Sequence, residues 1–199
     1  MTPEDFKRQL EELQAVIGDA VSYFSAWRGL MDVNEESAMA LNRYKGFFTP
    51  SRNALLGLAL LQLAKVFDFD RRTVSFRNLL AAAKNDPENL TPYATQAQLE
   101  QIELQISSKA AVLERLKRLR DQRVAHYDSN APERPSVPYE EVYGLVEEIK
   151  TMYNSLRVGH DRSVTAFDAL ARDAELHTSQ VVRMMCDEKE RVRRRSTEP

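Results

Sequence analysis

Apolar residues recur every three to four positions along most of this chain, and this spacing constrains the fold more than any other feature. The first such run contains Phe6, Leu10, Leu13, Ile17, Val21 and Phe24. This spacing places the apolar side chains on one side of an α-helix. The alternation of β-branched residues that indicates strands is nearly absent. The sequence therefore predicts an all-α fold, a helical bundle of about six helices.

Local signals locate individual helices. Asn34 is an expected N-cap, Pro50 suits a first helical turn, and Thr73 can cap a short helix that follows it. The segment 51–67 is apolar nearly all round, which is typical of a helix at the buried centre of a bundle. The longest periodic segment, residues 93–126, is expected to form one helix.

Length and composition indicate one soluble domain. With 199 residues and 43% hydrophobic content, a single helical domain over residues 1–199 is expected. The net charge of −2 means that any nucleic-acid contact needs a local basic patch. Cys186 is the sole cysteine, so no internal disulfide can form. The chain starts with polar residues and has no apolar run of bilayer length, so we expect a cytoplasmic protein without membrane association.

The segment Leu116–Asp128 combines several arginines with a histidine at the end of the longest predicted helix. Counting about 100° per residue places Arg120 on the same side of the helix as Leu116. A charged group there must extend to solvent, find a buried partner such as Asp68, or face a cleft or a second subunit. Arg118 falls on the exposed side by the same count.

Arg120 and His126 have side chains that can support the cleavage of RNA. A neutral imidazole can take the proton of a 2′-hydroxyl or return one to the leaving oxygen. An arginine can stabilise charge on the phosphoryl oxygens. On a regular helix the two residues lie about 120° and about 9 Å of rise apart. A shared site therefore needs a substrate that spans them, a distorted helix end or a second chain.

No metal or other cofactor is expected. The three histidines, His126, His160 and His177, are scattered along the chain. Neither of the spacings typical of zinc sites, His-Glu-x-x-His and Cys-x-x-Cys, occurs in the sequence.

The segment Arg120-Asp-Gln-Arg-Val-Ala-His-Tyr-Asp128 resembles the signature of the HEPN superfamily, in which an arginine and a polar residue precede a histidine. Other stretches are similar to the abortive-infection type U HEPN proteins, namely residues 54–68, residues 74–80 and the segment that begins at Pro138. The resemblance covers about 35–160. A C-terminal helix and a basic tail, about 161–199, follow it.

The resemblance implies a bundle that dimerises, with the arginine and the histidine of both chains lining one cleft. It also implies that Arg120 and His126 are the catalytic pair and that Asp121 fills the polar position. Members include metal-independent endoribonucleases of phage-defence and toxin–antitoxin systems. We therefore expect a homodimer, an RNA substrate, and an antitoxin or nucleotidyltransferase partner. Other members are inactive, so the alternative is an interaction module that binds RNA, a nucleotide or a protein.

Three further residues are candidates for substrate binding, namely Lys117, Arg123 and Tyr127. The two basic side chains can follow a phosphate backbone, although a solvated helix face accounts for them as well. Tyr127 can stack on a base or pack at the helix end. The catalytic pair also has a structural alternative, in which Arg120 forms an ion pair and His126 caps the helix C-terminus.

The signature allows four to six residues between the arginine and the histidine, so a second pair in this chain, Arg172 and His177, also satisfies it. This second pair has four intervening residues, whereas Arg120 and His126 have five. This copy lies in a polar predicted helix, apart from the stretches that resemble the HEPN proteins. We therefore assign the candidate site to the first copy and expect His177, like His160, to be a surface residue.

Overall fold

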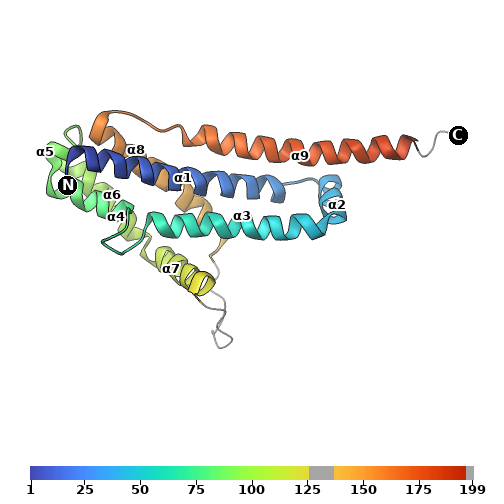
Figure 1. Ribbon diagram of the computed structural model, residues 1–199, viewed down its shortest axis with the longest axis horizontal. Helices are drawn as coiled ribbons and strands as arrows, with labels where there is room; N and C mark the ends of the chain where they lie inside the picture. Colours follow the sequence, from blue (N-terminus) through green and yellow to red (C-terminus); the bar gives the residue numbers. More distant parts are fainter. Residues whose placement is uncertain (126–136, 196–199) are drawn as a thin grey trace. The chain divides into compact units, whose positions relative to one another are not determined.

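The computed structural model describes residues 1–125 and 137–195, with the side chains of residues 1–121 and 137–188. The described residues form helices and no strand, which confirms the predicted all-α fold (Figure 1). The helices are α1 (Pro3–Met31), α2 (Glu35–Arg43), α3 (Lys45–Val66), α4 (Phe76–Asn85), α5 (Pro87–Leu90), α6 (Gln96–Ser108), α7 (Ala110–Ala125), α8 (Tyr139–Asp161) and α9 (Phe167–Arg195). None of them has the length and apolar content that a membrane crossing requires.

The expected number of about six helices is wrong, because the described residues contain nine. One addition is α5, a single turn that Pro87 starts within a predicted connection. Another arises at Lys109, where the backbone leaves the helical region at φ −98° and ψ 9°. This break divides the predicted helix 93–126 into α6 and α7, and each of the two then buries its own apolar side.

The chain divides into two compact units, which are described separately. Unit 1 comprises Met1–Ala20 and Leu60–Ala166, and unit 2 comprises Val21–Ala59 and Phe167–Pro199. The single domain over residues 1–199 stays a prediction.

Unit 1 has a core in which the predicted stripe of α1 is buried. Phe6 and Leu10 are both fully buried, and Tyr153 of α8 lies beside them with its hydroxyl donating to the carbonyl of Leu10 at 3.0 Å. His160 of α8 was expected at the surface, but this is wrong. Its ring is partly buried, 5.2 Å from the ring of Phe6, and its Nδ1 lies 2.6 Å from the carbonyl of Leu90. In the same unit, α6 contacts α4, α7 and α8.

Helix α3 differs from its prediction in two ways. It begins at Lys45 rather than at Pro50, which lies in its second turn. Since proline lacks an N–H group, its position there loses one helical hydrogen bond. The helix is also not buried on all sides, because Leu58 is 41% exposed. Apolar content alone does not determine how many sides of a helix other elements cover.

Unit 2 contains a smaller core, in which α2 packs against α9. The predicted N-cap is confirmed, since the side chain of Asn34 accepts from the amide of Ser37 at 2.9 Å. The buried apolar residues of this core are Leu30, Leu41, Phe48 and Val182. The last turns of α1 approach α9 closely, because a Cβ atom at Gly29 would lie 3.0 Å from the Cβ of Thr178.

Two glycines of α8 give a matched test of packing in unit 1. A Cβ atom at Gly159 would lie 2.7 Å from the Cβ of Ala94, whereas one at Gly144 would meet nothing within 4 Å. Gly144→Ala should therefore stabilise the protein by about 0.5–1 kcal/mol through helix propensity. Gly159→Ala should destabilise it by about 1–3 kcal/mol, since the overpacked contact outweighs that gain.

Denaturant unfolding of the two variants measures both effects. Stability changes of the same sign would contradict the close approach of α8 to Ala94 that the structure contains.

Candidate functional site

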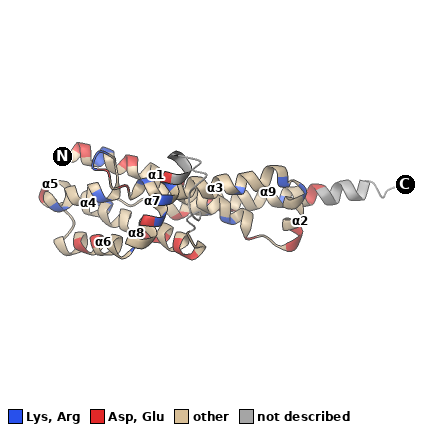
Figure 2. Cartoon of the chain, turned by 90° about the horizontal axis from the view of Figure 1, so that it is seen from below, with Lys and Arg blue, Asp and Glu red and all other residues tan. Residues whose placement is uncertain are grey.

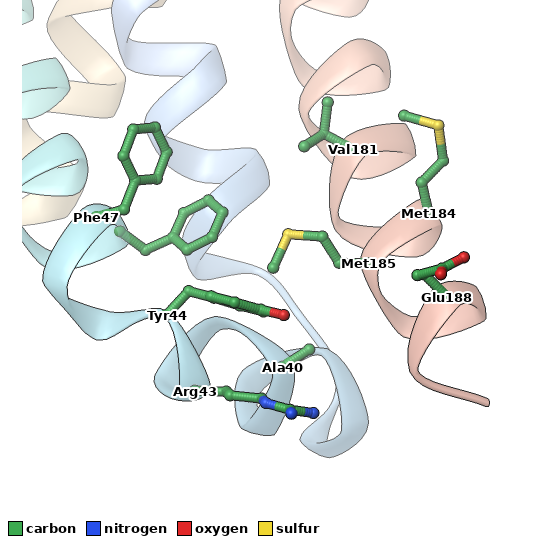
Figure 3. Close-up of a pocket in the computed structure, with 9 residues that line it drawn as sticks. Ala40, Arg43, Tyr44, Phe47, Val181, Met184, Met185 and Glu188 are labelled. Carbon is green, nitrogen blue, oxygen red and sulfur yellow. The ribbon is translucent and has the colours of Figure 1, made fainter. Parts of the chain in front are cut away.

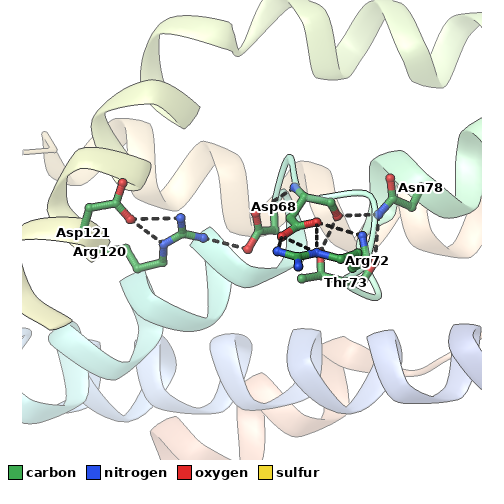
Figure 4. Close-up of polar contacts among 7 residues, drawn as sticks. Asp68, Arg72, Thr73, Asn78, Arg120 and Asp121 are labelled. Carbon is green, nitrogen blue, oxygen red and sulfur yellow. Dashed lines mark hydrogen bonds and ion pairs between the residues drawn. The ribbon is translucent and has the colours of Figure 1, made fainter. Parts of the chain in front are cut away.

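The loop between α3 and α4 is held by a set of local hydrogen bonds (Figure 4). The carbonyl of Asp70 accepts from the amide of Thr73 at 3.1 Å, from its hydroxyl at 2.8 Å and from the side-chain amide of Asn78 at 2.9 Å. The carboxylate of Asp70 pairs with Arg72 at 2.7 Å. The predicted cap at Thr73 is wrong, because Ser75 caps α4 and accepts from the amide of Asn78. The loop backbone therefore has a defined conformation.

Arg120 of α7 reaches this loop (Figure 4). Its Nη1 donates to Oδ2 of Asp68 at 2.8 Å, and its Nε and Nη2 each lie 2.9 Å from Oδ1 of Asp121. The other oxygen of Asp68 accepts from the amide of Asp70 at 3.1 Å. The side chains of Arg120 and Asp68 are 23% and 21% exposed, whereas that of Asp121 is 51% exposed. Asp68 therefore connects α7 to the loop through a partly buried ion pair.

Arg120 is a permanent cation in this setting. Burial acts to lower its pKa, but the hydrogen bonds and charges of Asp121 and Asp68 together raise it above its ordinary value. Arg120 can therefore bind and stabilise negative charge, and it cannot act as a base near neutral pH.

The predicted orientation of the arginine side chains around α7 is confirmed. Leu116 is 1% exposed and Arg120 shares its buried side of the helix. Arg118 lies on the solvent side, where its side chain is 66% exposed and pairs with Glu114 at 3.3 Å. Arg120 forms an ion pair with Asp68 of the same chain, which is the structural alternative for this residue. The expected partner at a subunit interface stays a prediction.

Lys117 is brought to a second feature of the same loop, the aromatic ring of Phe69. Charges of both signs are interspersed along the described helices, so a basic site must be local (Figure 2). Phe69 is 47% exposed, with Cζ of Arg77 4.2 Å and Nζ of Lys117 5.6 Å from its ring centroid. No motif in the sequence points to Phe69 or Arg77. The available signal was a bulky aromatic residue between two aspartates, outside any helical stripe.

The remaining predicted site residues cannot be placed beside Arg120. The backbone of Arg123 belongs to α7, but its side chain lies outside the described residues. His126 and Tyr127 also lie outside them. Their roles stay predictions. In the described part of the chain, no group of three or more histidine, cysteine or acidic residues is arranged to hold a metal ion.

Unit 2 contains an apolar pocket of about 520 Å³ that no sequence pattern predicts (Figure 3). Its lining comes from α2, the start of α3 and α9, and consists of Ala40, Arg43, Tyr44, Phe47, Phe48, Val181, Met184, Met185 and Glu188. Segments so far apart in sequence give no joint pattern that could reveal the pocket. Among the described residues, Arg43 and Glu188 are the only charged ones that line it, so we assign no catalytic role to it.

The fold and the site define a class of protein. The chain is all-α in its described residues, and the helix that carries a partly buried arginine leads in sequence to His126. The model of the HEPN family AbiU2 matches residues 3–181. The chain therefore belongs to the abortive-infection type U family of the HEPN superfamily. This match extends beyond the expected 35–160 at both ends. No curated protein and no solved structure matches the chain.

A double-mutant cycle tests the partly buried ion pair. Replacing Asp68 and Arg120 singly and together should give a coupling of about 1–2 kcal/mol, because both side chains are largely removed from water. The Glu114–Arg118 pair of the same helix is the matched control. Its coupling should be about 0.3–0.5 kcal/mol, as is usual for an exposed pair one turn apart. Equal couplings in urea unfolding would mean that Asp68 does not anchor α7.

Proposed function

We propose that this protein is a metal-independent endoribonuclease of a phage-defence or toxin–antitoxin system, in which Arg120 and His126 cleave RNA. The observation that carries the proposal is the state of Arg120, a partly buried and permanently charged guanidinium on the helix that leads to His126. Membership in the abortive-infection type U family supports the biological setting.

In the proposed reaction, the imidazole of His126 takes the proton of a 2′-hydroxyl while the 2′-oxygen forms a bond to phosphorus. The bond from phosphorus to the 5′-oxygen breaks, and an imidazolium returns a proton to that leaving oxygen. The products are a 2′,3′-cyclic phosphate and a 5′-hydroxyl. Arg120 stabilises the negative charge that builds on the non-bridging oxygens.

A phosphate can reach Arg120 without loss of its anchor. Contacts with described residues use one N–H from each of its three nitrogens, which leaves about two of the five donors of a guanidinium. We propose that the phosphate takes these donors and displaces Asp121, the more exposed carboxylate. Asp68 then remains in place and orients the guanidinium plane.

We propose that two copies of the chain complete the site. On a regular helix Arg120 and His126 point about 120° apart, so a second copy can bring its histidine to the arginine. The antitoxin or nucleotidyltransferase partner is proposed on the family resemblance alone.

A second candidate function is a non-catalytic HEPN module that binds RNA, a nucleotide or a protein partner. The observation that favours it is the same set of contacts at Arg120. All three nitrogens of its guanidinium already face carboxylates, so the residue has a sufficient structural role without any substrate.

Cleavage of a labelled RNA in EDTA by purified variants tests the proposed activity. His126→Ala should reduce the single-turnover rate by about 10²–10⁴-fold, because the proton transfer is lost. Arg120→Gln should reduce it by about 10²–10³-fold, because the developing charge loses its partner.

His177→Ala is the matched control, since Arg172 and His177 form a second arginine–histidine pair on α9, with four intervening residues in place of five and with both residues exposed. It should cleave at the wild-type rate. Wild-type protein that leaves diverse RNAs intact would favour the non-catalytic module, and an active His126→Ala variant would exclude the proposed mechanism.

A further inference from the structure

Phe69 directly follows Asp68, the ion-pair partner of the candidate catalytic arginine. Two cations from different helices, Arg77 of α4 and Lys117 of α7, lie near its ring. We propose that Phe69 is a stacking platform for one unpaired base of RNA, and that Arg77 and Lys117 bind the phosphates next to that base. The inference rests on the proposed RNA substrate and names the part of the strand that the protein recognises.

The ring of Phe69 is held in an accessible position. It is 47% exposed, although the loop that carries it is fixed by the hydrogen bonds around Asp70. An aromatic ring that is already ordered loses little conformational entropy when a base stacks on it. Aromatic side chains with nearby cations are the usual means by which proteins bind single strands without duplex pairing.

The acidic residues on either side of Phe69 do not leave a free negative charge near the ring. Asp68 is paired with Arg120 at 2.8 Å, and Asp70 is paired with Arg72 at 2.7 Å. These pairs reduce the repulsion that two aspartates would otherwise exert on a phosphate backbone.

Arg77 and Lys117, in contrast, have no carboxylate partner among the described residues. The Nε of Arg77 is buried and has no hydrogen-bond partner there. Burial also lowers the pKa of Arg77 from its ordinary value. A phosphate oxygen supplies the missing negative charge and is a strong hydrogen-bond acceptor.

The position of Lys117 connects the platform to the candidate catalytic residue. Lys117 precedes Arg120 by three residues on α7, so the two lie one turn apart on neighbouring parts of the helix surface. Arg120 in turn bonds to Asp68, the residue before Phe69. A strand with one base on Phe69 therefore has its phosphates directed along α7 toward Arg120.

Binding of a short 2′-O-methyl oligoadenylate in EDTA tests the platform. This probe cannot be cleaved, because its 2′-oxygen has no proton to lose. In fluorescence anisotropy with the full chain, Phe69→Ala should weaken binding roughly 5- to 100-fold, the usual range for one lost stacking contact. Phe69→Trp should retain wild-type affinity. Arg77→Gln and Lys117→Gln should each reduce the slope of log affinity against log salt by about 0.7.

Tyr93→Ala is the matched control. Tyr93 is 49% exposed, and Cζ of Arg162 lies 4.0 Å from its ring centroid, so it repeats the cation–aromatic pair in the loop before α6. The Tyr93→Ala variant should bind the probe with the affinity of the wild type. The proposal is overturned if Phe69→Ala weakens binding no more than Tyr93→Ala does, or if the wild type does not bind the probe.

The same series separates this proposal from the nuclease proposal. If binding depends on Phe69 but unmodified RNA is left intact, the stacking platform is supported and the proposed nuclease activity is excluded. If unmodified RNA is cleaved but Phe69→Ala binds the probe as the wild type does, the nuclease activity is supported and the proposed stacking platform is excluded.

Discussion

The candidate site depends on the ion pair between Asp68 and Arg120. A guanidinium on the apolar side of a helix must be compensated, because an unpaired buried charge costs several kcal/mol, on the order of 3–5 when one partner is removed. Asp68 compensates it at 2.8 Å and also accepts the amide of Asp70 with its second oxygen. One carboxylate therefore orients the arginine of α7 and shapes the loop that presents Phe69.

The same interaction explains how one residue can serve both stability and chemistry. Arg120 has two carboxylate partners that differ in exposure, with Asp68 at 21% and Asp121 at 51%. The less exposed partner is the costlier one to remove, so it keeps the guanidinium oriented. The more exposed partner interacts weakly in water and can yield to a phosphate. We propose that Asp121, which the resemblance places at the polar position of the HEPN signature, is a replaceable ligand of the arginine.

Short-range patterns in the sequence are sufficient to predict the all-α class, the cap at Asn34 and the inward side of Arg120, because each depends on helical spacing or on neighbouring residues. The break at Lys109 is not predictable, since apolar residues continue with helical spacing through it. The cluster of Phe69 with Arg77 and Lys117 is not predictable either. It arises when a loop and two helices meet, and no local pattern encodes that proximity.

The termini of cleaved RNA test the central claim most directly, because they record which oxygen attacks the phosphorus. Wild-type protein is incubated with unmodified RNA in EDTA, and both new ends are identified. Attack by the 2′-oxygen, with His126 moving the proton and Arg120 holding the phosphate, predicts a 2′,3′-cyclic phosphate and a 5′-hydroxyl. New ends that carry a 5′-phosphate, or RNA that remains intact, would contradict the account.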